Sequence, residues 1–314
     1  MLRPDPSRVF LFISAFFLHG RALAESGLSA ARILTVPLNA RADGLAGAFT
    51  GVPGALDSLG YNPAGLAALT SSEVESTFSP GVLDDYDGDF NYGRRVGPAV
   101  LSIGVLYYNG GSVQINPSSG ASYTVTAEQD TVGLAGLALP LKWGWSAGVL
   151  AKPFDLELAQ QAHAAGYAVD GGVLWRSFIP GLSAGASVEN MGPPVRFDSL
   201  ADPLPRTERA GASYAFQTLR SGEMLGAPVH FLITADALKP QDQNLGEAAG
   251  LEISQTYKNR FSIALRGGYL FNQNPNAVSF GASLRDGRLF FDYGINVFEN
   301  IYYPQSSFTL GYRF

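Results

Sequence analysis

The sequence predicts an all-β fold, a transmembrane antiparallel β-barrel of about 14 strands with an N-terminal hatch. The C-terminal segments alternate apolar and polar residues with period two, as strands with one apolar and one polar face do. The polar positions hold Gly, Ser and Ala with isolated charges of both signs, which suits a barrel lumen better than a solvent-exposed sheet. The N-terminus carries an export signal, and no later stretch approaches the roughly 18 apolar residues of a spanning helix.

Residues 1–24 are predicted to form a cleavable secretory signal peptide. Arg3 and Arg8 give a basic start, residues 9–18 are apolar, and an Ala-x-Ala cleavage motif ends at Ala24. An exported chain without a spanning helix can cross a membrane only as a closed barrel, because lipid cannot satisfy unpaired backbone groups. The predicted location is therefore the bacterial outer membrane, with outer-membrane lipid as a partner.

Residues 25–70 lack the alternation and are predicted to form a hatch inside the barrel. This stretch is rich in Gly and Ala, and small residues let a backbone pack closely against a surrounding wall. Asn62, Pro63 and Ala64 form a turn motif, since Pro63 fixes φ and the Asn62 side chain can bond nearby backbone. A barrel of this size leaves interior space that is either filled or conducts.

Residues 71–314 are predicted to form the barrel, with an even number of strands as in single-chain bacterial barrels. The stretch 122–126 is assigned to a loop, because counting it as a strand would break the parity. Connections alternate between short turns and longer loops, such as those at 109–129 and 153–165, which places both termini at the short-turn, periplasmic rim. Prolines are expected outside strand interiors. The expected strands are 72–79, 88–95, 98–108, 130–140, 143–152, 166–176, 181–190, 207–216, 228–237, 245–254, 260–270, 277–285, 288–297 and 306–314.

Charged residues at inward positions are expected either to pair inside the lumen or to line a wet path. Glu252, Arg266 and Asp292 lie on neighbouring or next-neighbouring strands and can form a ladder, since adjacent strands are about 4.8 Å apart. Arg41 and Asp43 of the hatch are expected to dock against lumen charges of opposite sign, such as Glu252 and Arg266. The other inward charges are Lys152, Asp170, Arg176, Glu189, Arg209 and Asp236.

Composition excludes several classes of function. A chain without Cys cannot form a disulfide framework, a Cys-ligated zinc site or an iron–sulfur cluster. A net charge of −6 argues against a nucleic-acid partner. No phosphate-binding, metal-binding or catalytic motif surrounds His163 or His230. The sequence therefore predicts no enzymatic activity and no cofactor.

The block NARADGLAGAFTGV…DSLGYNPAGLAAL resembles the N-terminal signature of the PorV/PorQ branch of the FadL-like outer-membrane barrels. Further blocks follow in the order of that branch through nearly all of the mature chain, from SAGVLAKPFDLEL and YAVDGGVLWR to the closing SSFTLGYRF. The resemblance implies a fourteen-stranded barrel closed by an N-terminal hatch that contains Asn62, Pro63 and Ala64.

The resemblance also implies two alternative functions. FadL-like relatives pass hydrophobic small molecules inward past the hatch without energy input, and passive uptake or binding of such molecules is the function expected here. PorV-like relatives work in type IX secretion, where their partners are secreted proteins received at the cell surface. This chain is shorter than the fatty-acid transporters and lacks their long extracellular loops. By resemblance, the assembly signal read by the barrel assembly machinery is formed by Phe308, Leu310, Tyr312 and Phe314.

Overall fold

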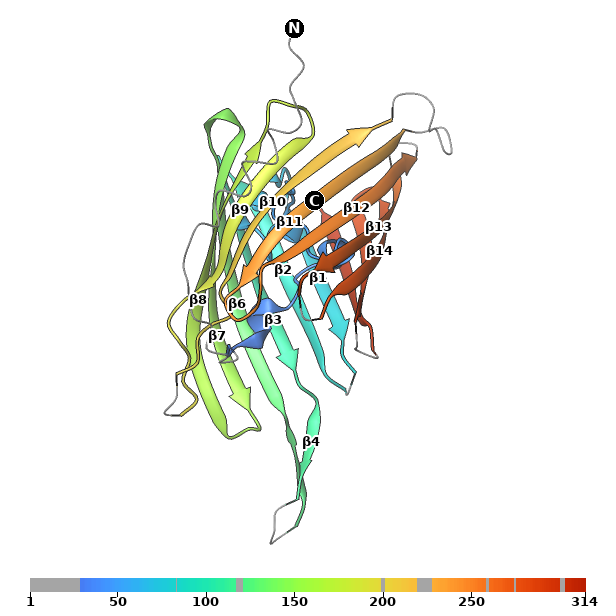
Figure 1. Ribbon diagram of the computed structural model, residues 1–314. Helices are drawn as coiled ribbons and strands as arrows, with labels where there is room; N and C mark the ends of the chain where they lie inside the picture. The colour runs from blue at the N-terminus through green and yellow to red at the C-terminus, as the bar shows by residue number, and fades with distance from the viewer. Residues whose placement is uncertain are drawn as a thin grey trace.

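The computed structural model describes residues 29–82, 84–116, 121–198, 201–218, 228–257, 260–273, 275–299 and 303–314. Its main element is a closed antiparallel barrel of fourteen strands (Figure 1). The predicted all-β fold is confirmed, whereas the predicted signal peptide lies outside the described residues. The barrel strands are β1 (Glu73–Pro80), β2 (Tyr86–Val96), β3 (Ala99–Asn109), β6 (Glu128–Pro140), β7 (Trp145–Leu158), β8 (Ala162–Arg176), β9 (Leu182–Met191), β10 (Thr207–Gln217), β11 (Val229–Pro240), β12 (Gly246–Tyr257), β13 (Phe261–Phe271), β14 (Ala277–Asp286), β15 (Leu289–Phe298) and β16 (Gln305–Arg313).

The two rims of the barrel differ. The C-terminal rim holds the start of β1 and the end of β16, where the backbone N–H of Phe314 donates to the carbonyl of Ser72 at 2.9 Å. At the opposite rim, β4 (Ser112–Ile115) and β5 (Tyr123–Thr126) form a hairpin that projects beyond the other strands, and we call this the hairpin rim (Figure 1). The assignment of 122–126 to a loop is therefore wrong. Because β4 and β5 pair with each other in a sheet of their own, the barrel keeps its fourteen strands.

Strands β7 and β8 reach further toward the hairpin rim than predicted. The expected long loop at 153–165 is wrong, because the two strands continue through most of it and only 159–161 separate them. Pro153 faces outward inside β7, contrary to the expectation that prolines avoid strand interiors. Proline has no backbone N–H, and the β6–β7 ladder is interrupted at Gly133 and Leu134, with the same register on both sides.

Most residues that face outward from the strands are apolar. On β14, Phe280 is 55% exposed while its neighbour Ser279 is fully buried. On β3, Ile103 is 65% exposed and the preceding Ser102 is buried. An apolar outer band around a more polar interior is the pattern of transmembrane β-barrels.

The barrel interior is occupied by residues 29–72, which we call the lumenal segment (Figure 1). Helix α1 packs against β14, β15 and β16, whereas η4 packs against β6, β7 and β8 on the opposite side of the barrel. Phe49, Leu56 and Leu66 are completely buried between these walls. No helix in the described ranges is both long and apolar enough to cross a membrane. The helices of the segment are η2 (Arg32–Thr35), α1 (Ala40–Asp43), η3 (Leu56–Ser58) and η4 (Pro63–Ala68).

The lumenal segment begins at the hairpin rim and ends at the C-terminal rim. The backbone N–H of Ala30 donates to the carbonyl of Pro203 at 3.0 Å, and the Ser29 hydroxyl donates to Asp242 at 2.9 Å. Both partners lie in connections at the hairpin rim. The first described residues therefore lie at the hairpin rim, whereas the expected N-terminal end at the short-turn rim lies outside the described residues.

The segment also bridges the seam where the first and last strands meet. The Thr77 hydroxyl of β1 donates to the carbonyl of Leu38 at 3.0 Å. The backbone N–H of Ala40 donates to the Thr309 hydroxyl of β16 at 2.9 Å, and the two threonine hydroxyls lie 3.0 Å apart. The barrel closes around the lumenal segment at this seam.

Close packing of the segment on the wall can be tested at two adjacent glycines of β13. A Cβ at Gly268 would lie 2.5 Å from the carbonyl carbon of Leu45, whereas a Cβ at Gly267 would meet only a carbonyl oxygen of Ser279 at 3.9 Å. Backbone cannot rotate away as a side chain can. We expect Gly268→Ala to lower the free energy of unfolding by about 1–3 kcal/mol and Gly267→Ala to change it by less than about 0.5 kcal/mol. Urea unfolding from lipid vesicles measures both, and equal effects would contradict the close contact.

Candidate functional site

Two cavities flank the lumenal segment inside the barrel. The hairpin-side cavity has a volume of about 370 Å³, and the C-terminal-side cavity has a volume of about 400 Å³. Both volumes lie within the range of small-molecule binding sites. The two cavities differ in the chemistry of their walls, and this difference limits what each can bind.

Part of the wall of the hairpin-side cavity is aliphatic, and the rest is polar or charged. The aliphatic residues come from the lumenal segment and from inward positions of the strands. They are buried and carry no polar atoms on their side chains, so this part of the wall favours an apolar ligand. They include Leu34, Leu106, Val132, Leu134 and Leu238.

The C-terminal-side cavity is lined by carboxylates and guanidinium groups. An apolar molecule would displace water from these charges without replacing their hydrogen bonds, which is unfavourable. The described residues hold no group of three or more His, Asp or Glu side chains arranged to bind a metal ion. The charged lining residues are Arg41, Asp57, Glu73, Glu75, Glu252, Arg266, Arg285, Asp292 and Arg313.

Arg266 lies between two carboxylates on the wall of this cavity. Its Nε is 2.5 Å from Glu252 Oε2, and its Nη1 is 2.9 Å from Asp292 Oδ1. Glu252 is the direct register partner of Arg266 across β12 and β13. The third arm of the guanidinium donates to the Ser283 hydroxyl. The three charges that the sequence places on nearby strands therefore form one connected ladder.

Arg41 connects the lumenal segment to this ladder. Its Nε lies 3.0 Å from Glu252, and its Nη1 lies 2.9 Å from Asp57 within the segment itself. Burial by itself would lower the pKa of Arg41, but the two carboxylates hold the pKa above its ordinary value. Arg41 therefore forms an ion pair with Glu252, one of the two lumen charges that the sequence analysis named as partners of the hatch.

Asp43 does not meet Arg266, the other expected lumen charge. Its Oδ2 accepts a hydrogen bond from the Ser307 hydroxyl at 2.6 Å. Burial raises the pKa of Asp43 to about 6, although hydrogen bonds from Ser307 and Asn296 act in the opposite direction. The expected pairing with Arg266 is wrong, because α1 places Asp43 against β15 and β16 instead of β13.

Asn62, Pro63 and Ala64 form the start of η4. The side-chain oxygen Oδ1 of Asn62 accepts from the backbone N–H of Ala64 at 3.1 Å, which caps the helix, and Pro63 occupies its first turn. The Asn62 amide donates to the carbonyls of Thr50 at 2.9 Å and Val173 at 3.0 Å. The motif thus ties the lumenal segment to β8, and the chain reaches β1 only after η4.

The wall of the hairpin-side cavity contains a polar cluster around Lys152. Its Nζ lies 2.6 Å from Asp170 and donates to the side-chain oxygen of Asn190 at 2.9 Å. The Asn190 amide in turn donates to the carbonyl of Leu34 in the lumenal segment at 3.3 Å. The β8–β9 register shifts at Asp170, and Asn190 has a φ of 57°. Sequence reasoning missed Asn190, since period-two alternation cannot locate a bulge.

The remaining predicted lumen charges divide between interior and rim. Arg209 Nε lies 3.0 Å from Glu189 on the adjacent strand. Asp236 accepts from the backbone N–H groups of Phe49 at 2.9 Å and Thr50 at 2.8 Å. Arg176 shares the inward parity of Leu174 and pairs with Ser183, but it is exposed because it lies at the end of β8, at the rim.

Comparison with known proteins identifies a fold. No family model and no curated protein matches the chain. The solved structure of the CymD monoaromatic hydrocarbon channel is 9% identical, covers 89% of this chain and 98% of that chain, and has a TM-score of 0.59. The toluene transporter TodX of P. putida is 11% identical, covers 82% of this chain and 94% of that chain, and has a TM-score of 0.52. The chain shares the barrel fold of these two proteins.

The contacts of Arg41 predict how strongly the lumenal segment is anchored in the barrel. Removing one partner of a buried ion pair costs about 3–5 kcal/mol, and we expect Arg41→Gln to fall near the lower limit, because 25% of its side chain is exposed. Arg260→Gln is the matched control, because Arg260 forms an ion pair with Asp286 on the surface. The exposed fraction is 74% for the Arg260 side chain and 52% for the Asp286 side chain. We expect no measurable change for Arg260→Gln in urea unfolding. Equal stability of both variants would contradict the anchoring role.

Proposed function

We propose that this chain is an outer-membrane barrel that binds hydrophobic small molecules in the hairpin-side cavity and passes them inward without an energy source. The observation that carries the proposal is the buried aliphatic part of the hairpin-side cavity, which has no counterpart of similar size in the more polar cavity on the other side of the lumenal segment. CymD and TodX, a monoaromatic hydrocarbon channel and a toluene transporter, share the fold and support this class of ligand.

The same contrast favours a lateral exit. An apolar molecule in the hairpin-side cavity would raise its free energy by moving on into the charged cavity. The wall beside it contains two defects, the interrupted β6–β7 ladder opposite Pro153 and the β8–β9 bulge at Asp170. Leu134 and Lys152 line the cavity next to the first defect. We propose that the ligand leaves through this part of the wall into lipid.

We propose that the lumenal segment is the hatch that closes the axial path. Its anchors are Arg41 on β12 and Asn62 on β8, which lie on different sides of the barrel. If the segment blocks the lumen, loosening one anchor raises ionic leakage. The Arg41→Gln protein is then expected to conduct more than the Arg260→Gln protein in planar bilayers.

The hairpin of β4 and β5 favours the alternative function, in which a secreted protein is the partner. It projects from the hairpin rim, and its strands pair with each other, so each keeps an outer edge that could accept another strand (Figure 1). This alternative does not require an apolar cavity. It ranks second because it leaves the aliphatic wall of the hairpin-side cavity without a role.

A pair of substitutions on β6 tests the binding of hydrophobic molecules. Leu134 is buried and lines the hairpin-side cavity, whereas Leu137 is 37% exposed on the outer face. We expect Leu134→Trp to weaken toluene binding by about tenfold or more, because the indole occupies the ligand volume. Leu137→Trp adds the same indole on the lipid side and should leave binding unchanged.

Binding of labelled toluene to protein in nanodiscs, corrected for empty nanodiscs, gives the comparison. Heat-dependent gel mobility shows whether each variant is folded. If folded Leu134→Trp protein binds toluene as well as Leu137→Trp protein does, the hairpin-side cavity is not the site.

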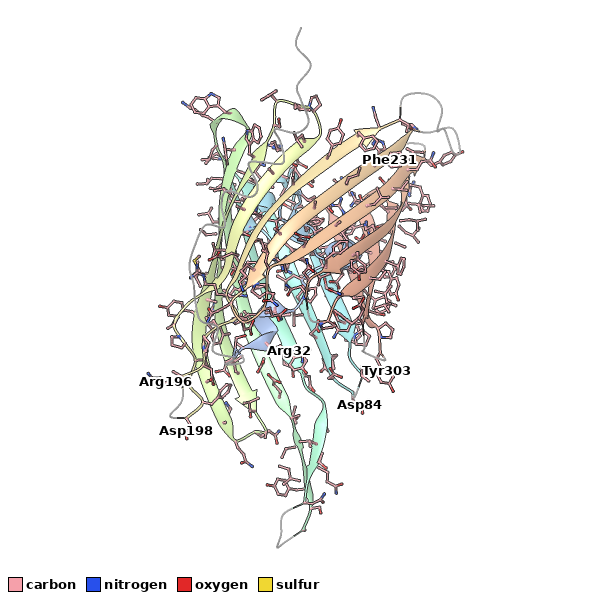
Figure 2. All side chains as sticks on the ribbon, in the orientation of Figure 1. Arg32, Asp84, Arg196, Asp198, Phe231 and Tyr303 are labelled. Atoms are coloured by element: carbon pink, nitrogen blue, oxygen red, sulfur yellow. The ribbon has the colours of Figure 1, made fainter. Side chains whose placement is uncertain are left out.

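We propose that the outward residues of β16 form the assembly signal that the barrel assembly machinery reads. Phe314 is 59% exposed, and Tyr303 in the preceding connection is an equally exposed aromatic at 60% (Figure 2). We expect Phe314→Ala to lower the amount of folded protein in outer-membrane fractions severalfold and Tyr303→Ala to have no effect. Equal membrane levels of both variants would exclude this role for Phe314. The other outward residues are Phe308, Leu310 and Tyr312.

A further inference from the structure

The hairpin-side cavity carries charges as well as an aliphatic wall, and the sign of these charges restricts its ligands. Two of its cations are neutralised by direct partners. Lys152 lies 2.6 Å from Asp170, and Arg209 lies 3.0 Å from Glu189. These pairs contribute no net charge to the cavity.

The remaining charged residues of the lining leave the cavity negative. Four carboxylates, those of Asp43, Asp85, Asp87 and Glu128, face it together with one guanidinium, that of Arg32, which gives a formal net charge of −3. The pKa of Asp43 is raised to about 6, so this carboxyl is mostly ionised at pH 7.5. Without Asp43, the formal charge would still be −2.

Three of these carboxylates lie at the mouth of the cavity. Asp85 belongs to the corner between β1 and β2, Asp87 is the second residue of β2, and Glu128 begins β6, all at the hairpin rim. Figure 2 shows Asp84 at the rim in this corner, and Arg32, which is exposed, lies on the lumenal segment. A ligand that enters from the hairpin rim therefore passes acidic side chains before it reaches the aliphatic wall.

We propose that this cavity selects hydrophobic amines and neutral aromatic molecules over carboxylates; the inference rests on the proposed function and narrows its class of ligand. A carboxylate that leaves water for a cavity of like charge loses hydration without gaining a partner for its charge, whereas an ammonium group gains attraction. Tyr108 lines the same cavity, and an aromatic ring attracts a cation that lies over its face. The aliphatic residues bind the apolar part of either molecule.

Three water-soluble ligands of similar size test the selection at pH 7.5: 2-phenylethylammonium, 2-phenylethanol and 3-phenylpropanoate. Equilibrium dialysis against the mature protein in nanodiscs of zwitterionic lipid, corrected for empty nanodiscs, gives each affinity. We expect the ammonium to bind about tenfold or more tightly than the carboxylate, with the alcohol between them. Equal affinities, or tighter binding of the carboxylate, would overturn the proposal.

Charge-neutral variants connect the selection to the cavity. In Asp87→Asn/Glu128→Gln protein, the ratio of ammonium to carboxylate affinity should fall about threefold or more, while the affinity for the alcohol changes less than about twofold. Asp198→Asn is the control, because Asp198 lies across the rim from Asp84 (Figure 2) and outside the cavity lining. An unchanged ratio in the folded double variant would overturn the proposal.

The alcohol separates this inference from the proposed function. If the alcohol binds and Leu134→Trp abolishes that binding, the proposed function holds whatever the ammonium does. If the alcohol binds but the ammonium has no advantage over the carboxylate, only the inference about charge fails. If none of the three ligands binds, the proposed function fails and the inference fails with it.

Discussion

The rest of the structure depends on the need to fill the interior of a fourteen-stranded barrel. A ring of this circumference encloses more space than the side chains of its own strands occupy, so another part of the chain must lie inside it. That segment brings backbone N–H and carbonyl groups into the lumen, and each buried group needs a partner. Asp236 on β11 receives the N–H groups of Phe49 and Thr50, and Val173 on β8 accepts from Asn62. Much of the polarity of the inner wall therefore serves the lumenal segment.

The same requirement explains why the interior charges form separate groups. Glu252, Arg266 and Asp292 form a ladder that also receives Arg41, so this group holds the lumenal segment against β12. Lys152 and Asp170 form a second group beside the ladder defects of β6–β9, where missing backbone bonds leave the wall less constrained. The first group stabilises the closed lumen, and the second reinforces the wall where the ladder is weakest.

The sequence predicts those features of the fold that depend on the local pattern of residues along a strand. Strand alternation reflects whether each side chain faces lipid or lumen, and this choice repeats every second residue, so the barrel and its strand number follow from the sequence. The nearness of Glu252 and Arg266 follows from the same rule, since they lie on consecutive strands at matching positions. The contact of Glu252 with Arg41 requires in addition only that the lumenal segment lies inside the barrel.

The features that the sequence does not predict depend on packing between distant parts of the chain. Asp43 meets Ser307 because α1 lies on β15 and β16, and nothing in the local pattern determines where α1 lies. A proline such as Pro153 is typical of the end of a strand. Because Pro153 faces outward inside β7, it interrupts the β6–β7 ladder only locally. Asn190 takes its role from a bulge with a left-handed backbone conformation, which alternation cannot reveal.

The hydrogen bonds at the seam have a consequence for the order of events during folding. Thr77 and Thr309 are separated by 232 positions and Ala40 and Thr309 by 269, so these contacts join nearly the two extremes of the described chain. Contacts over such long separations carry the largest entropic cost of loop closure and form late. Because Leu38 and Ala40 bond to the same two threonines, the seam is complete only when the lumenal segment lies against the inner side of β1 and β16. Closure of the barrel and enclosure of the lumenal segment are then a single late step in folding.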